Sequence, residues 1–290
     1  MKLERYLGNP ILARNPENPW EAGSVLNPNV LYDSGTFRMV YRATNDIHRN
    51  KAGRYVSSVG YAESTDGVHF QRFAEPLIVP DQEYEKRLGC EDPRVTKIDD
   101  TYFLYYTAVG GTESGEGVRI ALATSKDFKR WTKHGIVGPQ HTTSKAACLF
   151  PEMIQGQYIM FYTWMSDHPM SSIMQVRFDR VEDVMRPPSA VMADNLDHYQ
   201  ENVVFQPPER AFRGAEVGAV PIKTEAGWLF IYCNANTSDH AEWTSALRCL
   251  ICMIQERSSP KRRGPSWNLK QVKRWPVWST MLSSLKARWW

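Results

Sequence analysis

An all-β fold is predicted by three features of the sequence. Four segments share one pattern, in which a polar or glycine-containing turn leads into a run of aromatic and aliphatic residues. Each of these segments is followed by a second strand-like run. No segment of about 10 to 15 residues shows the 3.6-residue periodicity of an amphipathic helix. A parallel sheet with crossover helices is therefore not expected.

The repeated pattern defines the expected elements. First strands are expected in four segments, namely Ser34–Ala43, Asp99–Ala108, Gln155–Trp164 and Glu225–Asn234. Second strands are expected in Val59–Phe70, Ile120–Trp131, Ser171–Asp179 and Thr244–Ile254. In the first two of these, a Ser is followed two residues later by an Asp, which is typical of a turn. Four or five similar all-β units favour a β-propeller, and a β-sandwich is the alternative.

Composition and charge exclude several classes of protein. The 290 residues carry a formal net charge of +3, but residues 257–290 hold nine Lys/Arg and no acid. Residues 1–256 therefore carry 26 basic and 32 acidic side chains. An acidic body with a basic tail does not indicate a specific nucleic-acid reader. Because there is neither an apolar run of about 18 residues nor an apolar stretch near the start, we expect a cytoplasmic protein without membrane contact.

The cysteines predict neither disulfides nor a metal site. Five Cys residues show no disulfide-framework spacing, which fits a reducing compartment. Cys249 and Cys252 form a CxxC, but no second pair and no spaced histidines accompany it. We therefore expect no metal and no cofactor.

The sequence GCEDPRV, residues 89–95, is the strongest candidate for chemistry. Glu91 and Asp92 stand directly before Pro93, which restricts the backbone of Asp92 to extended geometry. A carboxylate held in a fixed position suits general acid or base catalysis. We interpret the pair as part of a loop that precedes a strand and faces the propeller axis. The structural alternative is that Asp92 pairs with Arg94 or caps a turn.

Other expected loops carry similar polar groups. They supply Asn27, Arg42, Glu152, Glu216 and Lys223, each of which also has a structural interpretation as an ion pair or a turn cap. No Ser/His/Asp order and no glycine-rich phosphate loop is present. Amides and carboxylates suit a neutral, hydroxyl-rich ligand, and an aromatic residue such as Trp20 or Tyr106 is expected to cover its apolar face.

Several motifs occur in an order that resembles glycoside hydrolase family 130. The motifs are NPIL (Asn9–Leu12), PWE (Pro19–Glu21), Asn27-Pro28, YRA (Tyr41–Ala43), STDG (Ser64–Gly67), GCEDPRV, LFPE (Leu149–Glu152) and PIKTEAGWLFIY (Pro221–Tyr232). The resemblance covers roughly residues 9–247. It implies a five-bladed propeller that acts on β-mannosides, either as a phosphorylase or as a hydrolase.

The resemblance also implies roles for individual residues. Asp92 would be the proton donor and would work through a sugar hydroxyl, while Asn27 and Arg42 would hold the mannosyl unit. Further substrate contacts are expected from four residues, namely Glu91, Arg94, Lys145 and Glu152.

The type of reaction depends on the phosphate site. In phosphorylases of the family, the resemblance places cationic residues where this chain has Lys145, Thr163, Glu216 and Cys233, and only Lys145 keeps that character. A carboxylate would repel phosphate by about 4 kcal/mol at 4 Å and an effective dielectric constant near 20. Inorganic phosphate is therefore not expected as a partner, and a β-mannoside oligosaccharide is.

A carboxylate opposite the proton donor suits an inverting hydrolase, in which the two carboxyl groups lie about 6.5 to 9.5 Å apart. Glu216 is the candidate base, and Glu242 is a second candidate. The structural alternative for Glu216 is a salt bridge to Arg213 or Lys223. A phosphorylase of the same family and a non-catalytic glycan-binding propeller are the alternative functions.

After about Leu247 the resemblance ends. We expect residues 1–256 to form the glycan-active propeller and residues 257–290 to form an aberrant tail, which holds five of the ten Trp residues. We interpret the tail as the product of an altered reading frame that leaves the fifth blade incomplete. An open propeller exposes a sheet edge that can pair with a second copy, so a homo-oligomer is one expected state. Loss of activity despite an intact Asp92 is a second expected consequence of an open propeller.

Overall fold

The computed structural model describes most of the 290 residues. The described ranges are 6–46, 54–110, 117–165, 171–205, 213–225, 227–235, 247–257 and 266–274. They fall into two compact units, an N-terminal unit within residues 2–136 and a C-terminal unit within residues 137–279. The fold is mostly β, as the sequence predicts.

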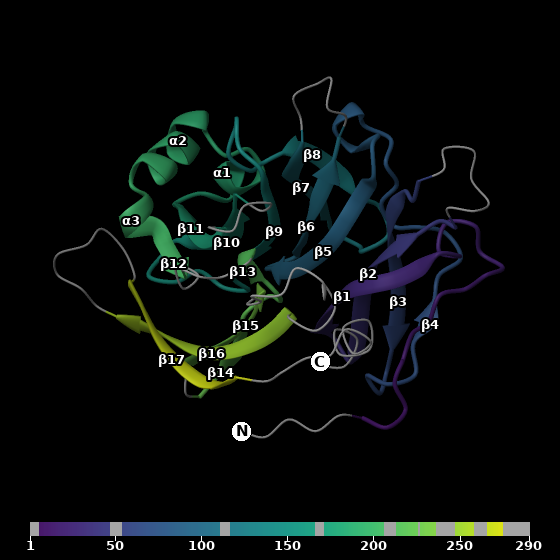
Figure 1. Ribbon diagram of the computed structural model, residues 1–290. Coiled ribbons are helices and arrows are strands. Elements are labelled where there is room, and N and C mark those ends of the chain that lie inside the picture. The colour runs from purple at the N-terminus through teal and green to yellow at the C-terminus, as the bar shows by residue number, and fades with distance from the viewer. Residues whose placement is uncertain are drawn as a thin grey trace. The chain divides into compact units, whose positions relative to one another are not determined.

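The described strands form three sheets, and the eight-stranded first sheet consists of two antiparallel modules joined by a bridge between β3 and β5, so four modules can be distinguished (Figure 1). Module 1 contains β1 (Ser24–Asp33), β2 (Thr36–Thr44), β3 (Ser57–Ser64) and β4 (Gln71–Arg72), and module 2 contains β5 (Gly89–Ile98), β6 (Thr101–Val109), β7 (Val118–Ser125) and β8 (Thr132–Ile136). Module 3 contains β9 (Ser144–Leu149), β10 (Tyr158–Trp164), β11 (Ser172–Phe178) and β12 (Val203–Phe205). Module 4 contains β13 (Arg213–Val217), β14 (Ile222–Thr224), β15 (Gly227–Ala235), β16 (Leu247–Arg257) and β17 (Ser266–Arg274).

The repeat predicted from the sequence corresponds to two strands in every module. The four expected first strands are β2, β6, β10 and β15, and the four expected second strands are β3, β7, β11 and β16. Both Ser-x-Asp turns also form as expected. Ser64 Oγ accepts a hydrogen bond from the Gly67 amide, and Ser125 Oγ accepts one from the Phe128 amide.

Three short helices were not expected from the sequence. They are α1 (Val181–Met185), α2 (Ser189–Asp197) and α3 (Tyr199–Asn202), and they lie between β11 and β12. A single-turn 3-10 helix, η1 (Glu83–Glu85), precedes β5. Because α2 has only nine residues and is the longest of the four, none of them spans enough turns to produce a clear 3.6-residue pattern.

Side chains hold β1 and β5 together in the N-terminal unit, where these two strands have no backbone pairing. Asn29 Oδ1 accepts a hydrogen bond of 2.8 Å from the Val95 amide in the buried middle of the strands. At the end of the strands, Asp33 Oδ1 accepts one of 2.9 Å from Lys97 Nζ, and Tyr102 donates to Asp33 Oδ2. The modules therefore have a fixed alignment along both strands.

Gly89 permits the backbone bridge that joins modules 1 and 2 into one eight-stranded sheet. It forms a parallel bridge to Ser57 and has a φ of +93°. A Cβ at this position would lie 2.0 Å from the Ser57 carbonyl oxygen, so only glycine fits. The start of β5 is thereby placed beside the start of β3.

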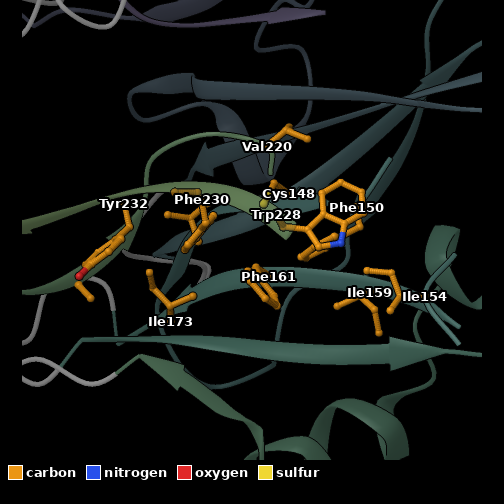
Figure 2. Close-up of a cluster of buried hydrophobic side chains, with 13 residues drawn as sticks. Cys148, Phe150, Ile154, Ile159, Phe161, Ile173, Val220, Trp228, Phe230 and Tyr232 are labelled. Carbon is orange, nitrogen blue, oxygen red and sulfur yellow. The ribbon is translucent and has the colours of Figure 1, made fainter. Parts of the chain in front are cut away.

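The C-terminal unit has its own core between modules 3 and 4 (Figure 2). Phe150 and Phe161 pack edge to face with ring centroids 4.8 Å apart, and Phe161 contacts Phe230 in the same way at 5.4 Å. Trp228 packs against Phe150 at 5.1 Å. Edge-to-face aromatic pairs add directional stabilisation to the area that they bury.

The Asp33 link between the modules predicts an acid-sensitive contribution to stability. Burial raises the pKa of the Asp33 carboxyl. The hydrogen bonds from Tyr102 and Lys97 together lower this pKa by more than burial raises it, so the net pKa lies below the ordinary value of 3.8. A carboxyl with a lowered folded-state pKa stabilises the fold above its unfolded pKa and loses this effect as the pH falls through the folded pKa. We expect Asp33→Asn to reduce the free energy of unfolding at pH 7 and to have little effect near pH 2, measured by urea titration. The matched control is Asp100→Asn, which removes an exposed carboxylate paired with Lys126. An equal loss in both variants at pH 7 would contradict the prediction.

Candidate active site

In modules 1 and 2, strands β1 and β5 each contain a β-bulge at an X-Pro pair. In β1 the register shifts between Leu26 and Asn29, and in β5 it shifts between Glu91 and Arg94. Asn27 and Asp92, the residues before the two prolines, have left-handed φ values of 47° and 50°. Proline lacks a backbone donor, so it is tolerated where the ladder is interrupted.

The interpretation of Glu91 and Asp92 as part of a loop before a strand is therefore wrong. Both residues lie inside β5, and Asn27 lies inside β1. The extended backbone expected for Asp92 from Pro93 is also wrong, because the bulge gives Asp92 a positive φ. The bulges turn these side chains out of the regular strand alternation, which is a common use of bulges near active sites.

Four side chains from the two modules meet at the bulges. Arg42 Nη2 lies 2.7 Å from Glu91 Oε1, and Arg42 Nη1 lies 3.5 Å from Asp92 Oδ1. Asn27 Nδ2 donates a short hydrogen bond to the same Asp92 oxygen. The side chains of Arg42, Glu91 and Asp92 are only 13%, 13% and 10% exposed, so their charges interact with little screening by water.

Arg42 remains a cation in this cluster. Burial lowers the pKa of its guanidinium, but the carboxylates of Asp92 and Glu91 raise it by more, and the net direction is upward. Arg42 Nε also donates to Ser57 Oγ at 3.1 Å, and the guanidinium lies over the Tyr55 ring at 5.3 Å from its centroid. One cation fixed between two carboxylates leaves a net negative cluster with a rigidly placed acid.

A cavity of about 530 Å³ borders Arg42 in the N-terminal unit. Its wall has both polar and apolar surface and consists of Arg14, Ala22, Gly23, Ser24, Leu26, Arg42, Thr44, Asn45, Asp46 and Tyr55. A wall of hydroxyl, amide and charged groups suits a hydroxyl-rich ligand better than an apolar one.

Two of the other expected ligand contacts lie in the interior. Tyr106 is 2% exposed and donates to Glu85 Oε1, so it does not cover a sugar face as the sequence suggested. Arg94 is 1% exposed and donates to the Pro93 carbonyl oxygen at 2.8 Å, and its role in substrate binding stays a prediction. Trp20 is half-buried, and its indole N–H donates to the Ala74 carbonyl oxygen.

A second pair of expected site residues meets in the C-terminal unit. Lys145 on β9 lies 3.2 Å from Glu216 on β13, with side chains that are 17% and 26% exposed. Thr163 is fully buried, and its Oγ1 accepts a hydrogen bond of 3.0 Å from the Val217 amide. Cys233 is buried, and it pairs with Glu216 in the register of β13 and β15.

The salt bridge from Glu216 to Lys223, which the sequence left as a structural alternative, does not form, and Lys223 pairs instead with Glu152 at 2.6 Å near the surface. The role of Glu152 in substrate binding stays a prediction. Glu242 lies outside the described residues. Asp92 and Glu216 belong to different units, so their common cavity also stays a prediction.

Sequence reasoning missed Ser57 and the buried acids Glu21 and Glu85. Ser57 contacts both Arg42 and Glu91, and it follows the unremarkable tripeptide Arg54–Val56. Glu21 and Glu85 have no exposed area and each binds a tyrosine hydroxyl. Tyr41 and Tyr106, which recur in the repeated strands, could have indicated these acids, because a buried tyrosine hydroxyl usually needs a hydrogen-bond partner.

Within the described residues, no group of three or more His, Cys, Asp or Glu side chains could hold a metal ion. No helix in the described ranges is long and apolar enough to cross a membrane.

Comparison with known proteins identifies the family. The sequence model of glycoside hydrolase family 130, described as β-1,4-mannooligosaccharide phosphorylase, matches residues 2–247. The chain is 35% identical over 242 residues to the 1,2-β-oligomannan phosphorylase of Thermoanaerobacter sp. (strain X514), covering 82% of this chain and 74% of the relative. It is 34% identical over 239 residues to the β-1,2-mannobiose phosphorylase of the same organism, covering 80% and 72%. The chain therefore belongs to glycoside hydrolase family 130.

Solved structures of the family share the fold. The β-1,2-mannobiose phosphorylase of Listeria innocua, solved with β-1,2-mannobiose, superposes with a TM-score of 0.64 at 22% identity, covering 87% of this chain and 78% of that one. A structure described with family 130 hydrolases that target β-1,2-mannosidic linkages in Candida mannan gives a TM-score of 0.66 at 22% identity, covering 87% and 76%. Both reaction types thus occur on this fold.

The cluster around Arg42 predicts a large stability effect. Arg42→Met leaves the Glu91 and Asp92 carboxylates side by side without a cation, so we expect the free energy of unfolding to fall by about 2 to 4 kcal/mol in urea titration. Adding Glu91→Gln to Arg42→Met removes one of the unpaired charges and is expected to restore part of the loss. A double variant that is less stable than Arg42→Met would contradict the role of charge compensation.

Proposed function

We propose that this chain is an enzyme that hydrolyses β-mannosides of the β-1,2 type with inversion of the anomeric carbon. Asp92 acts as proton donor, because the bulge, Asn27 and Arg42 hold its carboxyl in one position. Asn27 and Arg42 bind the mannosyl unit. Further substrate contacts come from Glu91, Arg94, Lys145 and Glu152. Glu216 activates the water, with Glu242 as the second candidate base.

The observation that carries the choice of hydrolysis is the ion pair between Lys145 and Glu216 at 3.2 Å. Phosphate needs several converging donors to offset its desolvation. Of the four positions where the family resemblance expects cationic residues, Lys145 alone is a cation, and its charge is already compensated. The Thr163 oxygen accepts a backbone hydrogen bond, and the Cys233 thiol is buried. A carboxylate among these groups favours water over an anion as the acceptor.

Phosphorolysis is the second candidate function. The sequence relatives at 34% and 35% identity carry names of phosphorylases, and this supports phosphate as cosubstrate. It requires that Lys145 be released from Glu216 when phosphate binds. A non-catalytic glycan-binding protein is the third candidate. Release of mannose by the unchanged protein that is lost in Asp92→Asn would exclude it.

We further propose that the modules are blades of a five-bladed propeller with an incomplete fifth blade. Four modules are present in the described ranges, and β16 and β17 provide two strands of module 4. The family match ends at residue 247, which lies at the start of β16. This supports a change in the chain near the proposed boundary between residues 1–256 and the tail of residues 257–290, but β17 of the tail pairs with β16 and so extends the sheet of module 4. An open edge beside the missing strands would favour a homo-oligomer.

The two reactions are separated by their products. We expect the protein to release mannose from β-1,2-mannobiose at the same rate with and without phosphate. The rate is measured by anion-exchange chromatography of the sugars. The released sugar should first appear as the α-anomer in proton NMR, as inversion requires. Asp92→Asn is expected to reduce the rate by at least a hundredfold, in line with the loss of a general acid. Formation of mannose 1-phosphate would refute hydrolysis, and an unaltered rate in Asp92→Asn would refute the assignment of the proton donor.

A further inference from the structure

One tyrosine stands opposite the bulge in each of the first two modules. Tyr41 on β2 faces the bulge of Asn27, and Tyr106 on β6 faces the bulge of Asp92, as the strand registers show. Both rings are buried. Module 3 has the same arrangement, because Tyr162 on β10 faces a register shift in β9 that contains Ala146 with a φ of 49°.

The tyrosines of modules 1 and 2 share a buried, charged support. Tyr41 donates to Glu21 Oε2 at 3.1 Å, and Tyr106 donates to Glu85 Oε1 at 2.6 Å. Both acids have no exposed area. Each forms an ion pair with a cation of the outermost strand, since Arg72 of β4 lies 2.8 Å from Glu21 and Lys133 of β8 lies 2.7 Å from Glu85.

Module 3 shows that the fold itself does not require this charge. Tyr162 donates to Asn195 Oδ1 at 2.6 Å, and this neutral partner comes from α2. The bulge in module 3 carries Ala146, which has no functional group, whereas the bulges of modules 1 and 2 carry Asn27 and Asp92. Buried ion pairs seldom stabilise a fold more than a neutral replacement does. The charged support therefore occurs where the bulge presents a polar side chain to the Arg42 cluster.

Glu85 touches both strands that flank the bulge of Asp92. Its carboxylate accepts the hydroxyl of Tyr106 on β6, and it also interacts with Cys90, two residues before Asp92 on β5. Burial raises the pKa of the Cys90 thiol, and neighbouring Glu85 raises it further, so Cys90 stays a neutral donor. The backbone N–H of Gln82 donates a hydrogen bond of 3.0 Å to Glu85 Oε2, and this bond connects η1 to the same network.

We propose that Glu85 and Tyr106 are positioning residues for Asp92, holding β5 and β6 at the separation that directs the Asp92 carboxyl towards Arg42 and Asn27. This inference rests on the proposed role of Asp92 as proton donor. The residues act through the backbone of the bulge and touch no substrate. Displacing a catalytic group by about 1 Å can lower a rate by about a hundredfold.

The test compares Tyr106→Phe with Tyr162→Phe, because the two variants remove the same hydroxyl from equivalent buried positions. We expect Tyr106→Phe to lower kcat on β-1,2-mannobiose by about ten- to a hundredfold with KM within about twofold. Tyr162→Phe is expected to lower the melting temperature by a similar amount and to change kcat by less than about twofold. Equal effects on kcat in the two variants, or no effect in Tyr106→Phe, would overturn the proposal.

Two further measurements keep the result interpretable. Amide hydrogen exchange at Val95, which donates to Asn29 Oδ1 beside the bulge, needs no turnover and is expected to accelerate in Tyr106→Phe but not in Tyr162→Phe. If Tyr106→Phe does not fold, Glu85→Gln keeps an acceptor for Tyr106 and removes the charge that faces Lys133, and it is expected to lower kcat by a smaller factor. Unchanged exchange and unchanged kcat in the variant that folds would contradict the role.

Asp92→Asn separates this proposal from the proposed function. If Asp92→Asn keeps full activity, the assignment of the proton donor fails, whatever Tyr106→Phe does. If Asp92→Asn is inactive and Tyr106→Phe is fully active, the positioning role alone fails.

Discussion

Charge compensation between side chains of neighbouring modules is the constraint on which both candidate sites depend. In the N-terminal unit, Arg42 of module 1 lies between two carboxylates of module 2. In the C-terminal unit, Lys145 of module 3 is matched by Glu216 of module 4. The register makes Glu91, Lys145 and Glu216 equivalent, because they pair with the residues that follow Tyr106, Tyr162 and Tyr232 on the adjacent strands. One structural position thus contributes a charged side chain to both sites.

The bulges explain how a regular sheet presents such a site. A flat strand would direct alternate side chains to opposite faces, and Asn27 and Asp92 would then have no reason to meet. The left-handed residue at each bulge re-aims its side chain, and β1 and β5 are close enough for Asn29 to bind the Val95 amide. Buried acids that hold the tyrosines opposite each bulge extend the support to the outermost strands. The rigidity of the acid therefore originates in the packing of whole modules.

Much of this arrangement was predictable from the sequence. The aromatic strands and their partner strands follow a pattern of alternating burial that can be read from the sequence. The segment GCEDPRV indicated an acid with a constrained backbone. The bulge at Asp92 was not predictable, because a proline in a strand-like segment indicates an interruption without giving its backbone geometry. The burial of Tyr106 was missed because an aromatic residue serves a core and a sugar site equally well. The helices from 181 to 202 were missed because they are too short for a periodic signal.

The compensation of Lys145 by Glu216 is the central claim about the reaction, and removing the carboxylate tests it most directly. Glu216→Gln removes the carboxylate that pairs with Lys145. The account predicts that hydrolysis of β-1,2-mannobiose falls by at least a hundredfold and that phosphate now binds and yields some mannose 1-phosphate. Glu182→Gln, which removes an exposed partner of Arg180, is the matched control and should behave like the unchanged protein. Hydrolysis that persists at the original rate in Glu216→Gln, with no response to phosphate, would contradict the account.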